Sequence, residues 1–143
     1  MDRSATIRSA ATDDLPSLLA LYRDLHPGDP ELDASTTGTA WVQVLATVGL
    51  TVLMAELAAT CTLPNLMHGA RAHALIENVV TLASHRQQGL GRAILDAAQA
   101  MAFTAGYCKV MLATGSHQDR TLRFYKRAGS EHGPKTAFQA RRP

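Results

Sequence analysis

Hydrophobic residues at helical spacing predict four helices along this chain. The clearest helix begins at Leu90 and ends before Gly106. Its apolar positions recur three and four residues apart, and they are Leu90, Ala93, Ile94, Ala97, Ala98, Met101, Ala102 and Ala105. A first helix is expected from about residue 15 to 25, where a capping residue and an early proline precede the apolar positions. Two further helices are expected, from about 37 to 48 and from 118 or 119 to 128.

Apolar and β-branched runs between these helices predict the strands of one sheet. The runs at 50–56 and 58–63 adjoin without the glycine, asparagine or aspartate of a usual hairpin turn, so the geometry of their connection is not predicted. A strand at 74–81, the long helix and a strand at 109–113 form a βαβ unit, which normally makes the two strands parallel. With a short segment at 6–8 and one or two strands within 130–140, we expect a mixed α/β fold. Its central twisted mixed sheet would have about six or seven strands, with about four flanking helices.

The composition is that of one globular domain. Of the 143 residues, 46% are hydrophobic and 18% are charged, which argues against a disordered chain. No linker or repeat divides the sequence, and a chain of this length can bury about two-thirds of the surface that its unfolded form exposes. We therefore expect a single domain over residues 1–143.

Charge, hydropathy and cysteine spacing narrow the class of partner. The net charge of +2 is too small to indicate a nucleic-acid-binding face. The N-terminal residues have no uncharged apolar core and no apolar run is long enough to span a membrane, so we expect no membrane partner and a cytoplasmic location. Cys61 and Cys108 have neither a CxxC spacing nor a nearby pair of histidines, so no metal site is expected.

Residues 86–93, Arg-Gln-Gln-Gly-Leu-Gly-Arg-Ala, form a glycine turn between the strand at 74–81 and the long helix. The first N–H groups of a helix have no intrahelical partners and carry a partial positive charge, so they bind anions. Gly89 and Gly91 let a large anion approach the backbone, and Arg86 and Arg92 add full charges. The turn is neither a P-loop nor a GxGxxG motif, and glycines before a helix often only relieve crowding. Phosphate binding and steric relief therefore both stay open from spacing alone.

Four motifs, in order, resemble those of the GCN5-related N-acetyltransferase (GNAT) family. They are the strand Ala-Leu-Ile-Glu-Asn-Val-Val-Thr (74–81), the glycine turn with its Q/R-x-x-G-x-G/A pattern, the segment Lys-Val-Met-Leu-Ala-Thr-Gly-Ser (109–116) and the helix segment Arg-Thr-Leu-Arg-Phe-Tyr-Lys-Arg-Ala-Gly (120–129). The resemblance extends from the first helix to about Gly129 and is strongest from Leu75 to Ala128. It implies the acyl-CoA N-acyltransferase fold and an acetyl-CoA-dependent N-acetyltransferase.

The resemblance also implies a cofactor site. In this family the glycine turn binds the pyrophosphate of acetyl-CoA through backbone N–H groups, and the splayed end of the fourth strand pairs with the pantetheine arm as an added strand would. The residues implied by these positions are Val79, Val80, Thr81, Arg86, Gln87, Gln88, Gly89, Leu90, Gly91, Arg92, Ala93, Gln118 and Tyr125. Gln118 stands where many members carry asparagine, so its amide either contacts the cofactor or caps the last helix.

Two residues are candidates for proton transfer. Tyr125 matches the family position where a tyrosine hydroxyl faces the sulfur of CoA, and a phenol with a pKa of about 10 is a reasonable proton donor to a thiolate. The alternative is an aromatic side chain that only packs beside Phe124. Glu77 matches the glutamate with which some members take a proton from the amine. The alternatives for Glu77 are a carboxylate on the wet face of its strand and one paired with an arginine for stability.

The connection between the first two helices covers the acceptor site in this family. Here it carries His26, Asp29, Glu31 and Asp33, a negative rim that suits a cationic amine, although an ordinary solvated loop would look the same. The function expected is transfer of the acetyl group of acetyl-CoA to a primary amine by direct attack in a ternary complex, by a protein that pairs as a homodimer. The alternative is a non-catalytic acyl-CoA-binding sensor or regulatory module of the same fold. The acceptor, a small molecule or a peptide, is not identified by the sequence.

Overall fold

The computed structural model describes residues 6–25, 27–30, 33–54, 58–63, 73–77 and 79–133. The chain divides into two compact units, Met1–Ala113 and Thr114–Pro143, and each is described by itself. The first unit contains the sheet and the second contains the last helix.

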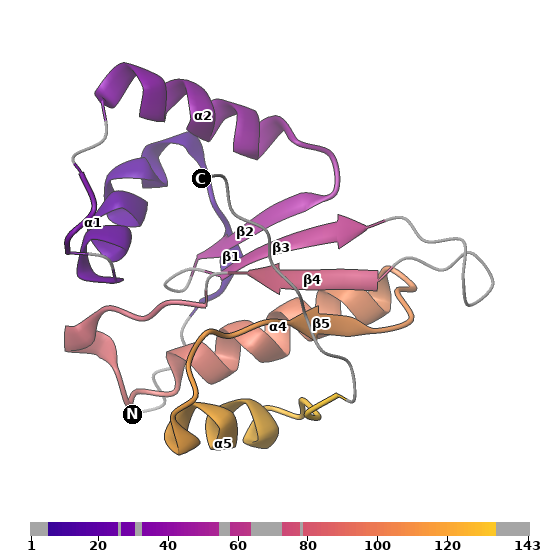
Figure 1. Cartoon of the computed structure of the whole chain (residues 1–143). Coiled ribbons are helices and arrows are strands. Elements are labelled where there is room, and N and C mark those ends of the chain that lie inside the picture. The colour runs from indigo at the N-terminus through magenta and orange to yellow at the C-terminus, as the bar shows by residue number, and fades with distance from the viewer. Residues whose placement is uncertain are drawn as a thin grey trace, which may run out of the picture. The chain divides into compact units, whose positions relative to one another are not determined.

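The sheet of the first unit is mixed, and the five strands that the described residues form follow one another in chain order (Figure 1). They are β1 (Arg8–Ser9), β2 (Leu50–Met54), β3 (Ala58–Leu63), β4 (His73–Glu77) and β5 (Val110–Leu112). Neighbouring strands are antiparallel except β4 and β5, which are parallel as the βαβ pattern predicts. The predicted count of six or seven strands is not confirmed. The expected final strands fall mostly on residues 134–140, outside the described part of the chain, as does the 55–57 connection between β2 and β3.

Four α-helices lie within the described residues, as the hydrophobic pattern predicts. They are α1 (Leu15–Leu25), α2 (Ala34–Ala46), α4 (Leu90–Thr104) and, in the second unit, α5 (Asp119–Arg127). Two short 3-10 helices, η1 (Thr12–Asp14) and η2 (Ala83–His85), precede α1 and the glycine turn. None of the described helices is long and apolar enough to cross a membrane.

The start of α2 and the end of β4 differ most from the sequence prediction. Helix α2 begins before residue 37 because Asp33 caps it: the Asp33 Oδ2 accepts a hydrogen bond of 2.7 Å from the Thr36 N–H. Strand β4 ends at Glu77 instead of reaching Thr81. The described residues 79–82 that follow are irregular and lead into η2, so the backbone leaves the sheet before the glycine turn begins.

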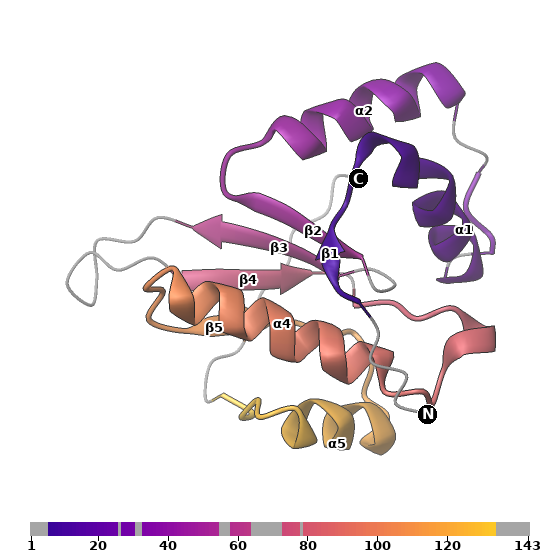
Figure 2. The same cartoon turned by 180° about the vertical axis from the view of Figure 1, so that it is seen from behind.

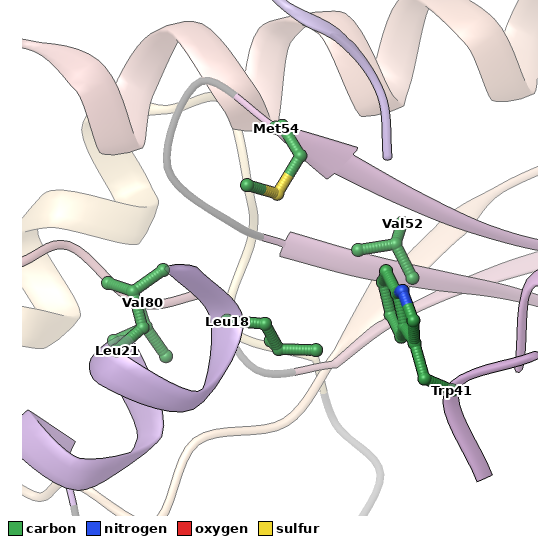
Figure 3. Close-up of a cluster of buried hydrophobic side chains, with 6 residues drawn as sticks. All are labelled: Leu18, Leu21, Trp41, Val52, Met54 and Val80. Carbon is green, nitrogen blue, oxygen red and sulfur yellow. The ribbon is translucent and has the colours of Figure 1, made fainter. Parts of the chain in front are cut away.

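Helices cover both faces of this sheet. Figures 1 and 2 show α1 and α2 on one face of the strands and α4 on the other. On the α1/α2 face, a buried cluster joins both helices to β2 and to the segment after β4; its members are Leu18, Leu21, Trp41, Val52, Met54 and Val80 (Figure 3). The Trp41 Nε1 donates a hydrogen bond of 3.1 Å to the carbonyl of Thr12, which fixes α2 against η1. On the other face, α4 buries Ile94, Leu95, Ala98 and Ala102.

Strand register assigns the side chains of β4 to these two faces. Thr51 lines a shallow surface cavity together with Ala98 and Ala102, so it lies on the α4 face. Thr51 pairs with Thr60, which in turn pairs with Ile76, and directly paired residues share a face. Successive side chains of a strand alternate between faces, so Glu77 lies on the opposite, α1/α2 face.

Candidate functional site

The glycine turn has left-handed backbone at two positions. Gly89, the N-cap of α4, has φ 82°, and Gln87 has φ 64°. Glycine adopts this conformation without strain, whereas a residue with a Cβ does so at a cost. Among the described residues, no heavy atom lies within 4 Å of a Cβ built on Gly89. Backbone conformation therefore requires glycine there, and the space beside it is open, so the glycine is not explained by crowding from its neighbours.

The first turn of α4 supplies hydrogen-bond donors at the same place. The first helical hydrogen bond here runs 3.0 Å from the Ala93 N–H to the carbonyl of Gly89. The N–H groups of Leu90 and Gly91 precede it in the helix and have no acceptor four residues back within α4. Together with the positive end of the helix dipole, this arrangement can hold an anion such as a phosphate.

Both arginines of the turn make contacts within the protein. The Arg86 Nε donates a hydrogen bond of 3.1 Å to the carbonyl of Thr81, and its Nη2 lies 3.4 Å from the Asp24 Oδ2. The Arg92 Nε lies 2.8 Å from the Asp96 Oδ1, one helical turn further along α4. Arg86 thus connects the turn to the segment after β4. The backbone N–H groups are then the most direct hydrogen-bond donors to an anion in this turn.

The end of β4 leads away from β5 toward the turn. The ladder between the two strands ends with the pair Ile76–Leu112. Val80 buries its side chain in the α1/α2 cluster and is 6% exposed, while Val79 and Thr81 are half-buried. Contact of this segment with a pantetheine arm, which the family resemblance implies, stays a prediction.

Glu77 is exposed at the last position of β4, on the α1/α2 face. It pairs with Ala59 across the β3–β4 ladder. The same face carries Leu75 and, opposite it on β5, Met111, which is 38% exposed. The carboxylate therefore borders a partly uncovered area of the sheet on the side where the connection between α1 and α2 also lies.

The acidic connection, residues 26–33, is described only in part. Asp29 is exposed, whereas His26 and Glu31 lie outside the described residues. Asp33 serves as the N-cap of α2, and the hydrogen bond from the Thr36 N–H lowers the pKa of its carboxyl. The structure therefore gives Asp33 a structural role, and a contact between Asp33 and a substrate stays a prediction.

The second unit contains Tyr125, on α5. The phenol is about half buried, and this burial raises its pKa, while a side-chain hydrogen bond with Thr114 acts in the opposite direction. Its ring meets that of Phe124 edge to face, with centroids 5.1 Å apart. Tyr125 therefore packs beside Phe124, and its phenol keeps its proton at neutral pH, which a proton donor requires. Thr114 is not among the residues predicted from the sequence, because nothing in the spacing of a single threonine indicates a contact with Tyr125.

Gln118 stands at the N-cap position of α5. Its backbone carbonyl accepts hydrogen bonds from the N–H groups of Thr121 and Leu122. Its side chain forms no capping hydrogen bond, and its Oε1 instead accepts 2.7 Å from the Arg120 Nε. Of the two expected roles, side-chain capping is wrong, and a contact with the cofactor stays a prediction.

No metal site emerges from the part of the chain that the structure describes. It contains no group of three or more His, Cys, Asp and Glu side chains that could hold a metal ion.

Comparison with known proteins identifies relatives of this fold. The model of the acetyltransferase (GNAT) family matches residues 11–129. A putative acetyltransferase from Agrobacterium tumefaciens str. C58 is 41% identical, with 96% of this chain and 99% of that chain covered and a TM-score of 0.90. A comparison with curated proteins gave no match.

Two more distant structures share the fold. A transcriptional regulator from Bacillus halodurans C-125 is 21% identical, with 94% and 98% of the two chains covered and a TM-score of 0.83. AAC(6')-Iy, solved in complex with the bisubstrate analogue CoA-S-monomethyl-acetylneamine, is 19% identical, with 96% and 98% covered and a TM-score of 0.75. At these identities the likeness concerns the fold alone.

Proposed function

The chain belongs to the acetyltransferase (GNAT) family, and from that premise we propose that it transfers the acetyl group of acetyl-CoA to a primary amine. The transfer is direct, within a complex that holds both substrates. The observation that carries the proposal is the glycine turn, where left-handed Gly89 opens α4 and the N–H groups of Leu90 and Gly91 have no acceptor within the helix.

The donor site follows from this turn. Of the expected donors from Gln88 to Ala93, the Ala93 N–H already donates to the carbonyl of Gly89, so the backbone N–H groups that precede it hold the pyrophosphate. The backbone of Val79, Val80 and Thr81 pairs with the amide groups of the pantetheine arm. The fold of AAC(6')-Iy, which was solved with a CoA-containing analogue, supports this assignment. The hydrogen-bond donors that this assignment needs are backbone N–H groups.

Glu77 and Tyr125 are assigned to the proton transfers. Acetyl-CoA supplies a thioester whose C–S bond breaks as the amine nitrogen bonds to the carbonyl carbon. Glu77 takes a proton from the amine, directly or through water, because only the neutral amine is a nucleophile. Tyr125 gives its proton to the departing thiolate, and burial favours the protonated phenol that this step needs. The exposure of Glu77 on the α1/α2 face supports its part in the proposal.

The acceptor is proposed to be a cationic amine. Asp29 adds negative charge to the connection between α1 and α2, and Glu77 lies on the same side of the sheet. A negative potential on this side attracts protonated amines, which lose a proton before they react.

Release of free CoA thiol from acetyl-CoA in the presence of a broad panel of amines tests this function. We expect amine-dependent release with polyamines, amino acids, aminosugars or peptide lysines, and the amines that react define the acceptor class. Acetyl-CoA binding without thiol release for any amine would favour the second candidate, a non-catalytic acyl-CoA-binding module. The fold is shared with a protein described as a transcriptional regulator, so this candidate is kept.

Calorimetry with acetyl-CoA, ATP and NAD side by side distinguishes both candidates from a general nucleotide-binding protein. Both predict that acetyl-CoA binds at least about tenfold more tightly than the other two, because only acetyl-CoA has a pantetheine arm to pair with residues 79–81. Equal binding of all three ligands would contradict the assignment of the site.

A further inference from the structure

We propose that Asp24, on the last turn of α1, is a positioning residue for the glycine turn. The inference rests on the proposed function, since it takes the turn to hold the pyrophosphate of acetyl-CoA. Asp24 lies far from the turn in the sequence and has no place in the motifs discussed above.

One carboxylate oxygen of Asp24 contacts the N–H of Ala83, before the turn, and the side chain of Arg86, its first residue. Its Oδ2 accepts a hydrogen bond of 3.1 Å from the N–H of Ala83, 59 residues further along the chain. The same oxygen lies 3.4 Å from the Nη2 of Arg86. Ala83 is the first residue of η2, and Leu82 before it makes no side-chain cap. A carboxylate on α1 therefore takes the place of the missing N-cap of η2.

Arg86 extends this contact to the other side of η2. The Arg86 Nε donates a hydrogen bond to the carbonyl of Thr81, which lies before η2. Arg86 itself follows η2 and is the first residue of the glycine turn. Asp24, Ala83, Arg86 and Thr81 form a continuous set of hydrogen bonds that surrounds η2. The set fixes both ends of the short helix that leads into the turn.

Apolar packing brings α1 and this segment together independently of Asp24. Val80 lies in the buried cluster with Leu18 and Leu21 of α1, and Leu82 is partly buried against that cluster (Figure 3). Ala83 to Gly89, which follow Leu82, are exposed. Asp24 provides a polar contact between α1 and the exposed residues Ala83 and Arg86.

This contact affects the direction of the backbone N–H groups that bind the anion. The N–H groups that bind a pyrophosphate have to converge on one place, and small displacements of preorganised donors reduce binding strongly. The Asp24 side chain is 33% exposed and the Arg86 side chain is 55% exposed. An ion pair this exposed adds little to the stability of the whole protein. Its main effect is local: η2 and residues 86–89 keep one conformation before the ligand arrives.

Asp24→Asn tests the proposal, because it removes the charge and keeps the shape of the side chain. We expect the Kd for CoA, measured by calorimetry, to rise about tenfold. Binding of pantetheine, which has no pyrophosphate, should stay within about twofold of the wild type, and so should kcat with saturating acetyl-CoA. Asp13→Asn, an exposed aspartate on η1, is the matched control and should leave the Kd for CoA unchanged.

Amide hydrogen exchange of the ligand-free protein provides a second measurement that needs no cofactor. In Asp24→Asn, exchange at residues 83–89 should become faster while the centre of α4 keeps its protection. If Asp24→Asn does not fold, Asp24→Glu can replace it in both measurements, because it keeps the charge but displaces the carboxylate.

The possible results separate this inference from the proposed function. An unchanged Kd for CoA overturns the role of Asp24, and so does an equal loss of CoA and pantetheine affinity, which indicates general destabilisation. Tighter CoA binding would mean that Asp24 competes with phosphate for Arg86, and would also overturn it. A wild-type protein that binds CoA no better than pantetheine would instead contradict the pyrophosphate site itself.

Discussion

At the scale of single residues, the left-handed backbone at Gln87 and Gly89 defines the shape of the glycine turn. Gly89 meets this requirement without strain, but Gln87 has a Cβ and adopts φ 64° at a cost of about 1 kcal/mol. Strained backbone is found at binding sites, where surrounding contacts hold it in place. The turn therefore combines one glycine that its conformation requires with one residue whose strain can be relieved by mutation.

Gln87→Gly should stabilise the protein. Removing the Cβ relieves the strain, and the greater freedom of glycine in the unfolded chain offsets part of the gain, so we expect a net increase of about 0.5 kcal/mol in the free energy of unfolding. Gly89→Ala is the matched control and should destabilise by about 1 to 2 kcal/mol, because backbone strain alone opposes it. Urea denaturation measures both changes. A Gln87→Gly variant less stable than the wild type would contradict this account of the turn.

Tyr125→Phe separates proton donation from packing. The ring remains beside Phe124, so the Kd for acetyl-CoA should stay within about twofold, whereas kcat should fall by about a hundredfold. Steady-state kinetics and calorimetry give the two values. Tyr107→Phe controls for the loss of a phenol elsewhere in the chain. An equal loss of kcat and of acetyl-CoA affinity would show that Tyr125 only supports binding.

At the scale of elements, β1 and η1 are joined by the ion pair of Arg8 with Asp14. The Arg8 Nη1 lies 2.6 Å from the Asp14 Oδ2 and Nη2 lies 2.7 Å from Oδ1. The same carboxylate accepts 2.8 Å from the Ala11 N–H. The hydrogen bonds of Arg8, then of Ala11, lower the pKa of Asp14 to about 2.

This ion pair should contribute to the free energy of unfolding at neutral pH and lose that contribution in acid. A carboxyl whose folded pKa is depressed stabilises the protein above its unfolded pKa of about 4, and that contribution is lost as the pH falls toward about 2. Asp14→Asn should therefore lower the Tm at pH 7 but have little effect at pH 2. Thermal melts across this range measure the difference, with Asp13→Asn as control. A difference between wild type and Asp14→Asn that does not change with pH would refute this interpretation.

The connection between α1 and α2 predicts a charge effect on the acceptor. Asp33 caps α2, so Asp29 is the cleaner residue to neutralise. Asp29→Asn should raise the KM for cationic amines by about threefold at low salt, with kcat unchanged, and added salt should reduce the difference. An unchanged KM for every amine that the enzyme accepts would exclude a role for this charge.

The elements that could be predicted from sequence are those with a strong local pattern. Helix α4 and the parallel β4–β5 pair follow from helical spacing and from the βαβ order. The start of α2 depends on a side-chain hydrogen bond of Asp33, and the contact of Asp24 with Ala83 joins residues far apart in the chain. Spacing contains no signal for such contacts, because they arise only when α1 packs beside the segment after β4.

The same limit applies to the candidate site. The glycine turn was predicted from its residues, and its left-handed Gly89 agrees with that prediction. The contacts of Arg86 with Thr81 and Asp24 are not predicted from the sequence, and neither is the contact of Arg92 with Asp96. The charge of the two arginines suggests only phosphate binding. The roles of Glu77 and Tyr125 rest on family resemblance and stay predictions.

At the scale of the whole molecule, membership of the acetyltransferase (GNAT) family accounts for the arrangement of the sheet and its helices in the first unit. In the first unit, the segment after β4 leads to the glycine turn, while Glu77 and the described residues 27–30 after α1 lie on the α1/α2 face. This arrangement suits a reaction that brings two substrates together beside one strand. That the whole chain forms a single domain, pairs as a homodimer and works in the cytoplasm stays a prediction.

An NMR titration of the labelled protein with CoA tests the central claim most directly, because it reports which backbone N–H groups meet the ligand. We expect the largest amide shifts at residues 88–93 and smaller ones at 79–81, and we expect pantetheine to shift the second group but not the first. Saturable CoA binding with its largest shifts elsewhere, and none in the glycine turn, would contradict it.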